Sequence, residues 1–450
     1  MLNQNRNTIF RDYFAWAVLA AYAVFLVWLA SDQPELLLFY RNLNYKSISI
    51  MAACVLSLTY IYLFITGILC CFYRPTPSLR NNRLLPTCTV IVPAYNEGAH
   101  VEETIDSLLD TDYPREKLKI IVINDGSQDD TWEYMSRGAA KAPDIITAIN
   151  LPRNCGKKNA IYLGVKMAKS EVIVTVDSDS EISPNTLRAL VSPIRTDRRV
   201  AAVAGSLRVK NPERDIIASI FDVMMVFGCE FLRAAQSVTG LALCTPGALS
   251  CYRRSVLLPL IDEWMAQTFM GQPSHIGEDR ALATLILRGN HRIVHQRTAV
   301  VRTCVPDTLK GTWKMLLRWN RGDMRENLRM AKLTLCSFPH WNIRIWIMLA
   351  YWIALIQNIA MAFLFIPSFV MMIMFTKAPA AFLAANAFMA LFWALIPASI
   401  YVFHTRPRKA VWAFLYGAFF PYILSLLTTY CFLTLRDSRW MTREISKKKK

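Results

Sequence analysis

Five long apolar runs surround one polar stretch, and this arrangement limits the folds that the chain can adopt. The runs cover residues 13–30, 48–73, 345–375, 380–403 and 411–435. Each is long enough to cross the hydrocarbon core of a bilayer, which takes about 20 residues in a helix. With 54% hydrophobic and 19% charged residues, the chain is too apolar for an ordinary soluble protein and too polar to lie wholly in a membrane. We therefore expect a water-exposed domain between membrane segments.

Basic residues beside the runs indicate which side of the membrane each segment faces. Lysine and arginine next to membrane spans mark the cytoplasmic face. In this chain of net charge +18 they gather at residues 74–83, 406–409 and 436–450, and this placement does not indicate a nucleic-acid partner. We expect a multi-pass protein of the cell (inner) membrane, in contact with membrane lipids, whose central domain and C-terminal tail are cytoplasmic.

The number of runs conflicts with a cytoplasmic tail if every run is a simple span. Five spans from a cytoplasmic N-terminus would place the tail outside the cell. Either the last run is broken by Pro421, or the run that contains Pro367 is partly interfacial. We favour a broken last run. The first run does not resemble a cleavable signal peptide, because its apolar stretch is long and bulky Trp28 and Leu29 stand where small residues are needed.

The cysteines form no recognisable disulfide or zinc pattern. The chain has 11 cysteines without a Cys-x-x-Cys pair, and some lie inside apolar runs, which predicts buried, reduced thiols. His291 and His295 are separated by a strand-like segment that lacks a glutamate. The helical zinc motif needs that glutamate, so we do not expect zinc there.

The polar middle of the chain alternates between strand-like and helix-like patterns. Strands are predicted at residues 89–92, 119–123, 145–150, 172–176 and 201–204, and helices at residues 100–109, 157–168 and 184–194. Strands separated by helices indicate a mostly parallel sheet with helices on both faces. Ligands of such sheets bind beyond the C-terminal ends of the strands. The polar motifs of this chain fall at those ends.

Three of these motifs offer hydrogen-bond donors or charges to a ligand. Residues 92–98, Val-Pro-Ala-Tyr-Asn-Glu-Gly, connect a strand to a helix, and Asp125 is the first charged residue after the next strand. An ordinary turn and a helix cap are the structural alternatives, although a cap favours Asp129 or Asp130. Lys157 stands at a predicted helix start, where free N–H groups and the helix dipole favour an anion such as a diphosphate. The alternative for Lys157 is a solvated surface lysine.

Asp177-Ser178-Asp179 is the most informative short motif. It follows the apolar stretch at residues 172–176, so both carboxylates reach the same side only if the chain leaves the strand there. Their oxygens are the hard ligands that Mg²⁺ or Mn²⁺ prefers, and such a metal would neutralise a diphosphate leaving group. A further acidic motif, Gly-Glu-Asp-Arg at residues 277–280, precedes a helical pattern and also fits an ordinary helix start with early acids.

In this order, the motifs resemble those of the family 2 glycosyltransferases with a GT-A fold, and specifically the membrane-embedded processive synthases of hyaluronan, chitin and cellulose. The likeness extends from about residue 89 to about residue 443 and is greatest to hyaluronan synthase and rhizobial chito-oligosaccharide synthase. Further segments that carry it are Ala-Ala-Gln-Ser at 234–237, Tyr-Arg-Arg-Ser at 252–255, Val-Pro-Asp-Thr at 305–308, Arg-Trp at 318–319 and Trp-Met-Thr-Arg at 440–443.

The resemblance implies roles for matching positions. Asp279 would be the general base that deprotonates the acceptor hydroxyl in a single inverting displacement, and Asp179 would bind the metal. The residues implied in binding the nucleotide-sugar are Pro93, Ala94, Tyr95, Glu97, Asp125, Lys157, Asp177, Arg318, Trp440 and Arg443. Among them, Asp125 and the preceding loop would hold the uridine, and Lys157 the diphosphate. The residues implied in binding the acceptor are Glu278, Arg280, Trp319, Tyr252 and Arg253.

Three positions depart from the pattern of the family. Met315 stands where the family has glutamine, residues 246–248 are Pro-Gly-Ala where hyaluronan synthases have Ser-Gly-Pro, and Met441 replaces a glycine. Trp319 still offers an apolar face to an acceptor sugar, and Arg318 still reaches phosphate. The differences leave sugar transfer intact and weaken the prediction of processive polymerisation.

Basic residues recur every three or four positions from Lys310 to Lys332. At about 100° per residue they fall on one helical face. We expect an interfacial helix with Trp313, Leu316 and Leu317 toward lipid and the basic face toward headgroups or substrate phosphate. The alternative is a solvated basic face, and a glycine at position 322 favours an interruption of the helix.

The expected organisation is a cytosolic α/β domain of GT-A type inserted between α-helical membrane segments. The parts are two N-terminal transmembrane helices in residues 1–74, the GT-A domain in 75–306, interfacial amphipathic helices with the Arg-Trp motif in 307–343, C-terminal transmembrane helices in 344–435 and a basic cytosolic tail in 436–450.

We expect an inverting, Mg²⁺- or Mn²⁺-dependent transferase that moves a sugar, with N-acetylglucosamine as the best guess, from a UDP-sugar to a growing β-linked polysaccharide and translocates the product. Its partners are then the UDP-sugar, the nascent polysaccharide or a lipid acceptor, and membrane lipids, without nucleic acid. One alternative is transfer of a single sugar to a membrane lipid, as in relatives of ceramide glucosyltransferase, which Met315 favours. A non-catalytic membrane channel or scaffold is the other, and the intact Asp177, Asp179 and Asp279 oppose it.

Overall fold

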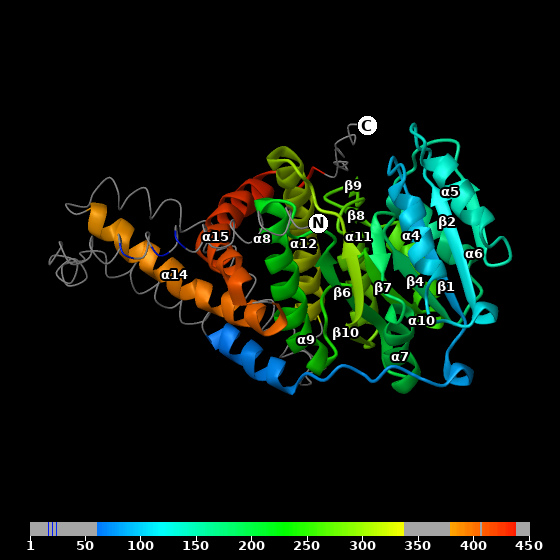
Figure 1. The fold of residues 1–450 in the computed structure, drawn as a ribbon, viewed down its shortest axis with the longest axis horizontal. Helices are drawn as coiled ribbons and strands as arrows, with labels where there is room; N and C mark the ends of the chain where they lie inside the picture. Colours follow the sequence, from blue (N-terminus) through cyan, green and yellow to red (C-terminus); the bar gives the residue numbers. More distant parts are fainter. Residues whose placement is uncertain are drawn as a thin grey trace. The chain divides into compact units, whose positions relative to one another are not determined.

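The computed structural model describes residues 61–336, 379–405 and 407–437, together with the isolated positions 17, 20 and 24 (Figure 1). The predicted apolar runs at 13–30 and 345–375 therefore lie almost wholly or wholly outside the described residues, as does most of the basic tail. The chain divides into two compact units. One unit comprises Thr66–Asn211, Gly228–Leu349 and Thr434–Lys450, and the other comprises Met1–Ile65, Pro212–Phe227 and Ala350–Leu433.

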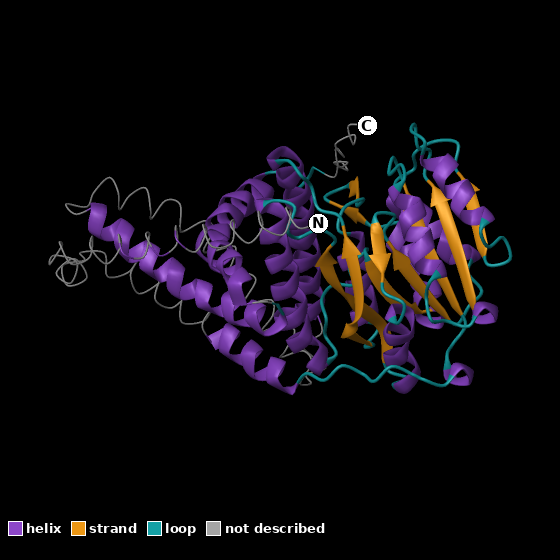
Figure 2. Ribbon diagram, in the orientation of Figure 1, coloured by secondary structure: helices purple, strands orange, loops and turns teal. Residues whose placement is uncertain are grey.

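An eight-stranded sheet forms the centre of the first unit, with strand order β3-β2-β1-β4-β7-β6-β10-β5 (Figure 2). The strands are β1 (Cys88–Ala94), β2 (Leu118–Asn124), β3 (Ile146–Asn150), β4 (Val172–Val176), β5 (Ser180–Ile182), β6 (Val200–Val209), β7 (Leu249–Arg253) and β10 (Arg292–Thr303). The five strands predicted from the sequence are confirmed, and β5, β7 and β10 are added to them.

The sheet is mostly parallel, as predicted. Parallel pairs join β1 to β2 and β4, β2 to β3, and β6 to β10. Strand β7 runs antiparallel to its neighbours β4 and β6, and β5 runs antiparallel to β10. Every residue of β1 and β4 is buried, which explains why these strands are continuous apolar runs without the alternation of a half-exposed strand.

Helices connect and cover the strands of this sheet. They are α4 (His100–Leu109), α5 (Thr131–Ala140), α6 (Lys157–Met167), α7 (Thr186–Thr196), α9 (Ala234–Thr239), α10 (Arg254–Met265) and α11 (Glu278–Arg288). The three predicted helices are confirmed within two residues at each end. Helix α4 buries Val101, Thr104, Ile105 and Leu108. The short hairpin β8 (Thr268–Phe269) and β9 (Gln272–Pro273) separates α10 from α11.

Helix α12 (Leu309–Cys336) is one uninterrupted helix of 28 residues. Leu316 and Leu317, which we predicted to face lipid, are each only 5% exposed and lie inside the protein. Arg321 and Arg325 of the predicted basic face are buried as well. Arg325 Nη2 donates to the carbonyl oxygens of Leu435 and Asp437 at 2.8 and 2.9 Å. The predicted faces are therefore wrong at Leu316, Leu317, Arg321 and Arg325, which tertiary contacts cover, whereas Trp313, Lys310 and Lys332 are exposed.

Two glycines allow α12 to cross the start of α11 at very close range. Gly277 precedes α11 with a φ of 73°, a left-handed conformation that favours glycine. A Cβ atom on Gly277 would lie 2.7 Å from Gly322 Cα, and a Cβ atom on Gly322 would lie 2.8 Å from Gly277 Cα. The crossing thus fixes the position of residues 278 and 279 against α12, and Gly322 serves this contact without interrupting its helix.

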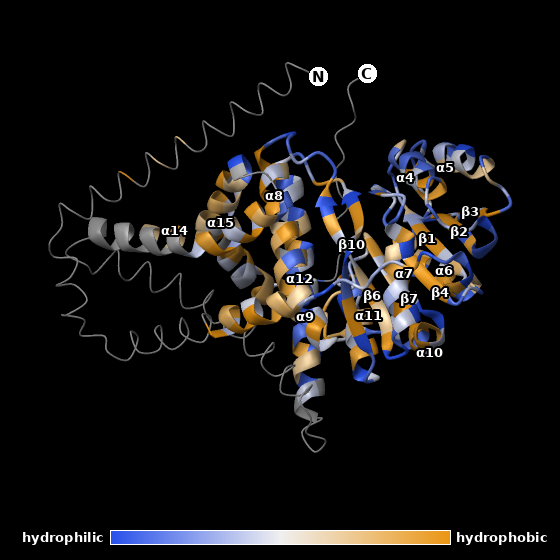
Figure 3. Ribbon diagram, turned by 60° about the horizontal axis from the view of Figure 1, so that its bottom comes forward, coloured by the Kyte–Doolittle hydropathy of each residue, from blue (hydrophilic) through white to orange (hydrophobic). Residues whose placement is uncertain are grey.

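The other unit contains α8 (Ile216–Val226), α14 (Pro379–His404) and α15 (Ala410–Leu433). Hydrophobic residues predominate along α8 and α15 (Figure 3). The buried core includes Val223, Val411 and Trp412, and Tyr401 Oη donates to buried Asp222 at 2.8 Å. The π-helix Phe227–Arg233 follows α8.

Helix α15 bends by 45° between Ala410–Phe420 and Ile423–Leu433. The bend falls at Pro421, where we predicted a broken run, and proline interrupts helical hydrogen bonding. Among the described residues no single helix meets the length and hydropathy of a membrane span, whereas the two halves of α15 meet them together.

The close crossing predicts the effect of a small substitution. We expect Gly322→Ala to lower the free energy of unfolding by about 1–3 kcal/mol, because the added methyl group overpacks a rigid backbone contact. Gly228→Ala is the matched control, since a Cβ atom there meets nothing within 4 Å. Thermal unfolding followed by circular dichroism measures both. An unchanged or higher melting temperature for Gly322→Ala would contradict the predicted clash.

Candidate active site

The C-terminal ends of β3, β2, β1 and β4 lie side by side and bring the predicted motifs together. Ala94 at the end of β1 pairs with Asn124 at the end of β2, which pairs with Asn150 at the end of β3. Hydrogen bonds then tie the loops that follow. Asp125 N donates to the Ala94 carbonyl oxygen at 2.9 Å, and Gln128 N donates to Asn96 Oδ1 at 2.9 Å. The edge is thus a connected group of loops.

A pocket of about 510 Å³ opens among these loops. Its walls include the aromatic side chains of Tyr95 and Trp132 and the polar residues Asn124, Asn150 and Arg153. Pockets of about 300–1,000 Å³ hold small ligands, and aromatic faces beside polar groups suit a planar heterocycle. Of the predicted loop, Tyr95 lines this pocket. Pro93 and Ala94 are the last two residues of β1 and are buried in the sheet.

Asp125 lies beside this pocket and holds the next loop in place. Its Oδ1 accepts a hydrogen bond from Cys155 N at 2.8 Å, and its Oδ2 accepts one from Gly156 N at 2.7 Å. Burial raises the pKa of Asp125, and the two N–H donors oppose that rise. The adjacent Gly126 has a φ of 67°, and a Cβ atom there would lie 2.4 Å from the Arg153 backbone. The Asp125 carboxylate therefore joins the loops after β2 and β3.

Lys157, in the first turn of α6, meets two of the predicted acids. Its Nζ atom forms an ion pair with Asp177 Oδ1 and lies 3.8 Å from Glu278 Oε1. Burial opposes the charge of Lys157, but the two carboxylates outweigh this effect and raise its pKa. Arg318 of α12 is close enough to act electrostatically on both Lys157 and Glu278. The structure thus brings together two cations that can face a diphosphate.

Asp179 is the last residue of the Asp177-Ser178-Asp179 turn, and its side chain is buried. Its Oδ1 accepts hydrogen bonds from Thr303 Oγ1 and Ser180 Oγ, each at 3.2 Å. Thr104 Oγ1 donates to the Ser178 carbonyl oxygen at 2.9 Å and fixes the turn from α4. Thr104 and Thr303 carried no signal in the sequence, because each acts from a distant element.

The carboxylate oxygens of Asp177 and Asp179 suit a hard divalent cation, but they supply only part of its ligands. The described residues contain no group of three or more His, Cys, Asp and Glu side chains placed to hold a metal ion. Mg²⁺ commonly binds through one or two protein carboxylates and takes phosphate and water for the rest. Asp179, with Asp177 beside it, matches that type of site, which needs a phosphate ligand to be complete.

Asp279 lies in the first turn of α11, where the Gly277 crossing places it. Its Oδ1 accepts from Arg280 N at 2.8 Å, and Cys244 Sγ lies 3.5 Å from its Oδ2. Thr245 Oγ1 donates to the Asp279 carbonyl oxygen at 3.1 Å. Glu278 is adjacent, and its pKa is raised by burial and by the Asp279 carboxylate. Asp279 and Glu278 thus join Lys157 and Asp177 in one acidic and basic group.

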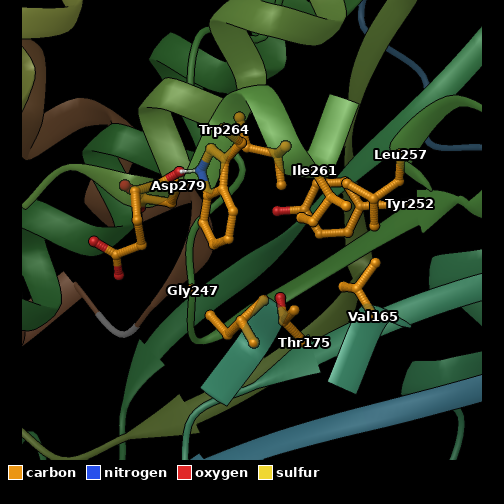
Figure 4. A pocket seen from close by; sticks show the side chains of 11 residues that line it. Val165, Thr175, Gly247, Tyr252, Leu257, Ile261, Trp264 and Asp279 are labelled. Atoms are coloured by element: carbon orange, nitrogen blue, oxygen red, sulfur yellow. Dashed lines mark hydrogen bonds between the residues drawn. The ribbon is translucent and has the colours of Figure 1, made fainter. Parts of the chain in front are cut away.

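A small cavity of about 20 Å³ lies behind Asp279 (Figure 4). Its walls include Tyr252, Ile261 and Trp264, and Trp264 Nε1 donates to the Glu278 carbonyl oxygen at 2.8 Å. A space of this size holds about one water molecule, so a sugar must bind outside it. The pocket beside Tyr95, in contrast, is large enough for a nucleoside.

The predicted acceptor residues do not all reach this site. Tyr252 lines the small cavity and donates to Thr245 Oγ1 at 3.0 Å, and Trp319 is half-buried on α12 beside Arg318. Arg280 is buried and lies 3.3 Å from Asp323 Oδ1. Arg253 lies at the opposite end of the sheet, because it pairs with Val172 at the start of β4.

The remaining predicted residues have other surroundings. Arg253 donates to carbonyl oxygens of the segment 194–200 and so has a structural environment. The Glu97 backbone N–H donates to Thr131 Oγ1 at 2.9 Å. Trp440 and Arg443 lie outside the described residues, and their roles stay predictions.

Comparisons with known proteins place these motifs in a family. The model of the family "Glycosyl transferase family 2" matches residues 89–258. The chain is similar to an N-acetylglucosaminyltransferase of Azorhizobium caulinodans, with 31% identity over 370 residues, 81% of this chain and 89% of that protein. It is similar to a hyaluronan synthase of Streptococcus pyogenes, with 30% identity over 366 residues, 79% of this chain and 82% of that protein.

Among solved structures, the chain resembles the mannosyltransferase PcManGT from Pyrobaculum calidifontis, determined in complex with GDP-Man and Mn²⁺. The TM-score is 0.55 at 21% identity, covering 84% of this chain and 98% of that one. This likeness shows a shared fold, and it confirms the predicted α/β domain of GT-A type.

The Asp125 contacts predict a local effect of losing the carboxylate. We expect Asp125→Ala to lower the free energy of unfolding by about 1–3 kcal/mol, because the N–H groups of Cys155 and Gly156 lose a charged acceptor that joins two loops. Hydrogen exchange at these two amides should accelerate, while the amides of β4 keep their protection. Asp144→Ala at an exposed position is the control. Unchanged exchange at Cys155 and Gly156 would contradict this role.

Proposed function

Because the chain belongs to glycosyltransferase family 2, we propose that it transfers N-acetylglucosamine from its UDP-sugar to a growing β-linked polysaccharide, with inversion at the anomeric carbon. The observation that carries this proposal is the single group formed by Lys157, Asp177, Glu278 and Asp279 at the sheet edge. The names of the two similar transferases support the donor sugar and the polymeric product.

The donor occupies the edge from the large pocket to α6. The uracil ring lies in the pocket between Tyr95 and Trp132, where aromatic faces and polar groups surround it. Asp125 shapes this end through the loop of residues 154–156. The diphosphate faces Lys157 and Arg318, whose positive charges stabilise the negative charge on the departing UDP.

The transfer step uses one base. An Asp279 carboxylate oxygen takes the proton of the acceptor hydroxyl as that oxygen forms a bond to the anomeric carbon. The bond from this carbon to the UDP oxygen breaks, and UDP leaves with the electron pair. Lys157 and Arg318 stabilise the charge that develops on the leaving group. A divalent cation held by Asp179, with Asp177 nearby, would supply further positive charge at the diphosphate.

The protein acts in a membrane, with its catalytic unit on the cytoplasmic side. The helix Ile61–Phe72 exposes Phe64 and Phe72 to about 70% and 69%, and α15 exposes Leu433 to 75%. Such exposure of large apolar side chains is unfavourable in water and favourable in lipid. The basic residues around these segments support a cytoplasmic position for the catalytic unit and the tail.

Replacing the base should stop transfer without preventing donor binding. We expect Asp279→Asn to reduce UDP release from UDP-N-acetylglucosamine by about 10²- to 10⁴-fold, the usual contribution of a general base. Calorimetric binding of UDP should change by less than about twofold. Asp262→Asn, which alters an exposed ion pair with Lys166, is the control. Retained UDP release in Asp279→Asn would sink the assignment of the base.

The donor, the metal and the product are tested with the purified protein. UDP release is measured across UDP-sugars with Mg²⁺, Mn²⁺ or a chelator, and the product is sized and digested by linkage-specific hydrolases. We expect N-acetylglucosamine to be preferred, the chelator to abolish turnover, and a long polymer to form. A single glycolipid product would replace polymer synthesis with lipid glycosylation.

Membrane association predicts how the protein fractionates. We expect the full chain to remain in the membrane pellet through washes with high salt and with alkaline carbonate, and to enter solution with detergent. Apolar insertion survives loss of electrostatic attraction, whereas a basic protein bound only to headgroups is released by salt. Release by either wash would contradict insertion.

A further inference from the structure

Helix α6 begins with two consecutive lysines that have opposite surroundings. Lys157 faces Asp177 and Glu278, whereas Lys158 is only 3% exposed and points into the protein. Lys158 Nζ lies 3.1 Å from the Ser274 carbonyl oxygen and 3.4 Å from the Met265 carbonyl oxygen. Consecutive helical residues differ by about 100° in direction, which separates these two cations.

The two carbonyl groups that Lys158 contacts lie on either side of the β8–β9 hairpin. Met265 is the last residue of α10, and Ser274 directly follows β9. Ser274 N donates to the Gln267 carbonyl oxygen at 2.9 Å and closes the base of the hairpin. The chain then runs from Ser274 to Glu278 and Asp279. Lys158 therefore donates to the carbonyl groups at both ends of the hairpin, just before the Glu278-Asp279 motif.

Trp264 links the same lysine to the acidic motif directly. The Lys158 Nζ atom lies 5.0 Å from the centroid of the Trp264 ring, within the range of a cation–π contact. The indole Nε1 donates to the Glu278 carbonyl oxygen at 2.8 Å (Figure 4). Trp264 is 1% exposed, so its position is set by packing. A continuous set of contacts thus runs from Lys158 through Trp264 to the residue before Asp279.

The ammonium group of Lys158 contacts backbone carbonyl groups and has no carboxylate close to it. Within the described part of the chain, no Asp or Glu side chain lies within 4.0 Å of its Nζ. The charged groups that act on it are Arg329 and Glu326 of α12 and Glu278, and His275 is nearby. Burial lowers the pKa of Lys158 to about 8, and Arg329 adds to this effect. Its charge therefore disappears at mildly alkaline pH.

We propose that Lys158 is a positioning residue for the transfer step, whose ammonium group holds both ends of the β8–β9 hairpin and, through Trp264, sets where Asp279 lies relative to α6. Lys157, one residue earlier on α6, faces the leaving group. Lys158 thereby couples the helix that holds the donor to the loop that carries the base. This role in catalysis rests on the proposed function, whereas the two hydrogen bonds from Lys158 to the ends of the hairpin do not.

The coupling predicts a separation of kinetic constants. Small misplacements of a catalytic group cost up to about 100-fold in rate, so we expect Lys158→Met to lower kcat by about 10- to 100-fold. The KM for the UDP-sugar should change by less than about threefold, because Lys157 and the nucleoside pocket remain. Lys166→Met is the matched control, since Lys166 lies on the same helix and pairs with Asp262 at the surface.

The pH dependence separates positioning from simple packing. In the unaltered protein, kcat should fall as pH rises through about 8, because Lys158 is charged below this pKa and neutral above it. In Lys158→Met this alkaline fall should be absent. Hydrogen exchange in residues 266–277 should be at least about tenfold faster in the variant at pH 7, and the ratio to the unaltered protein should approach one by about pH 9.5.

A second variant guards against misfolding. Trp264→Phe keeps a ring over Lys158 and removes the donor to the Glu278 carbonyl oxygen, so we expect a severalfold lower kcat with the alkaline fall retained. Equal hairpin exchange in Lys158→Met and the unaltered protein would overturn the proposal. An unchanged kcat or an unchanged alkaline limb in that variant would also overturn it. Hairpin exchange that responds as expected in a protein without UDP-sugar turnover would instead locate the failure in the proposed function.

Discussion

Carboxylates crowded at the end of a parallel sheet must each be given a partner, and the rest of the catalytic unit is arranged around this constraint. Asp125 is paired with backbone N–H groups, Asp177 with Lys157, and Asp179 with hydroxyl groups. Each solution draws on a different element, from the loop after β3 to β10. A buried negative charge is costly without such partners, so meeting this requirement also assembles the site.

Helix α12 connects three parts of the molecule that are distant in sequence. It crosses the start of α11 at Gly322, carries Arg318 toward the Lys157 cluster, and binds the chain after α15 through Arg321 and Arg325. Arg321 Nη2 donates to Thr434 Oγ1 at 2.7 Å. A helix with so many specific contacts behaves as a scaffold, which explains why Arg321 and Arg325 of its basic face are buried by protein.

Periodicity along the chain was sufficient to predict strands β1, β2, β3, β4 and β6. Runs such as residues 172–176 are too apolar for a half-exposed strand, and the motifs that follow them could be expected at one edge. The antiparallel β7 escaped prediction because it lies between helical segments without an alternating pattern. Arg253 was misplaced for the same reason, since the direction of β7 decides which end of the sheet it reaches.

The sequence by itself determined the fold class, the family and the order of the acidic motifs, because these depend on local pattern and on residues adjacent in the chain. Only the tertiary structure decided which charged side chains meet. Lys157 and Lys158 are the same residue type at adjacent positions of α6. Because consecutive helical residues point in different directions, the first faces Asp177 and the second faces the Ser274 carbonyl group. Their roles depend on the surfaces that pack against α6, and these come from segments about 20 to 120 residues away.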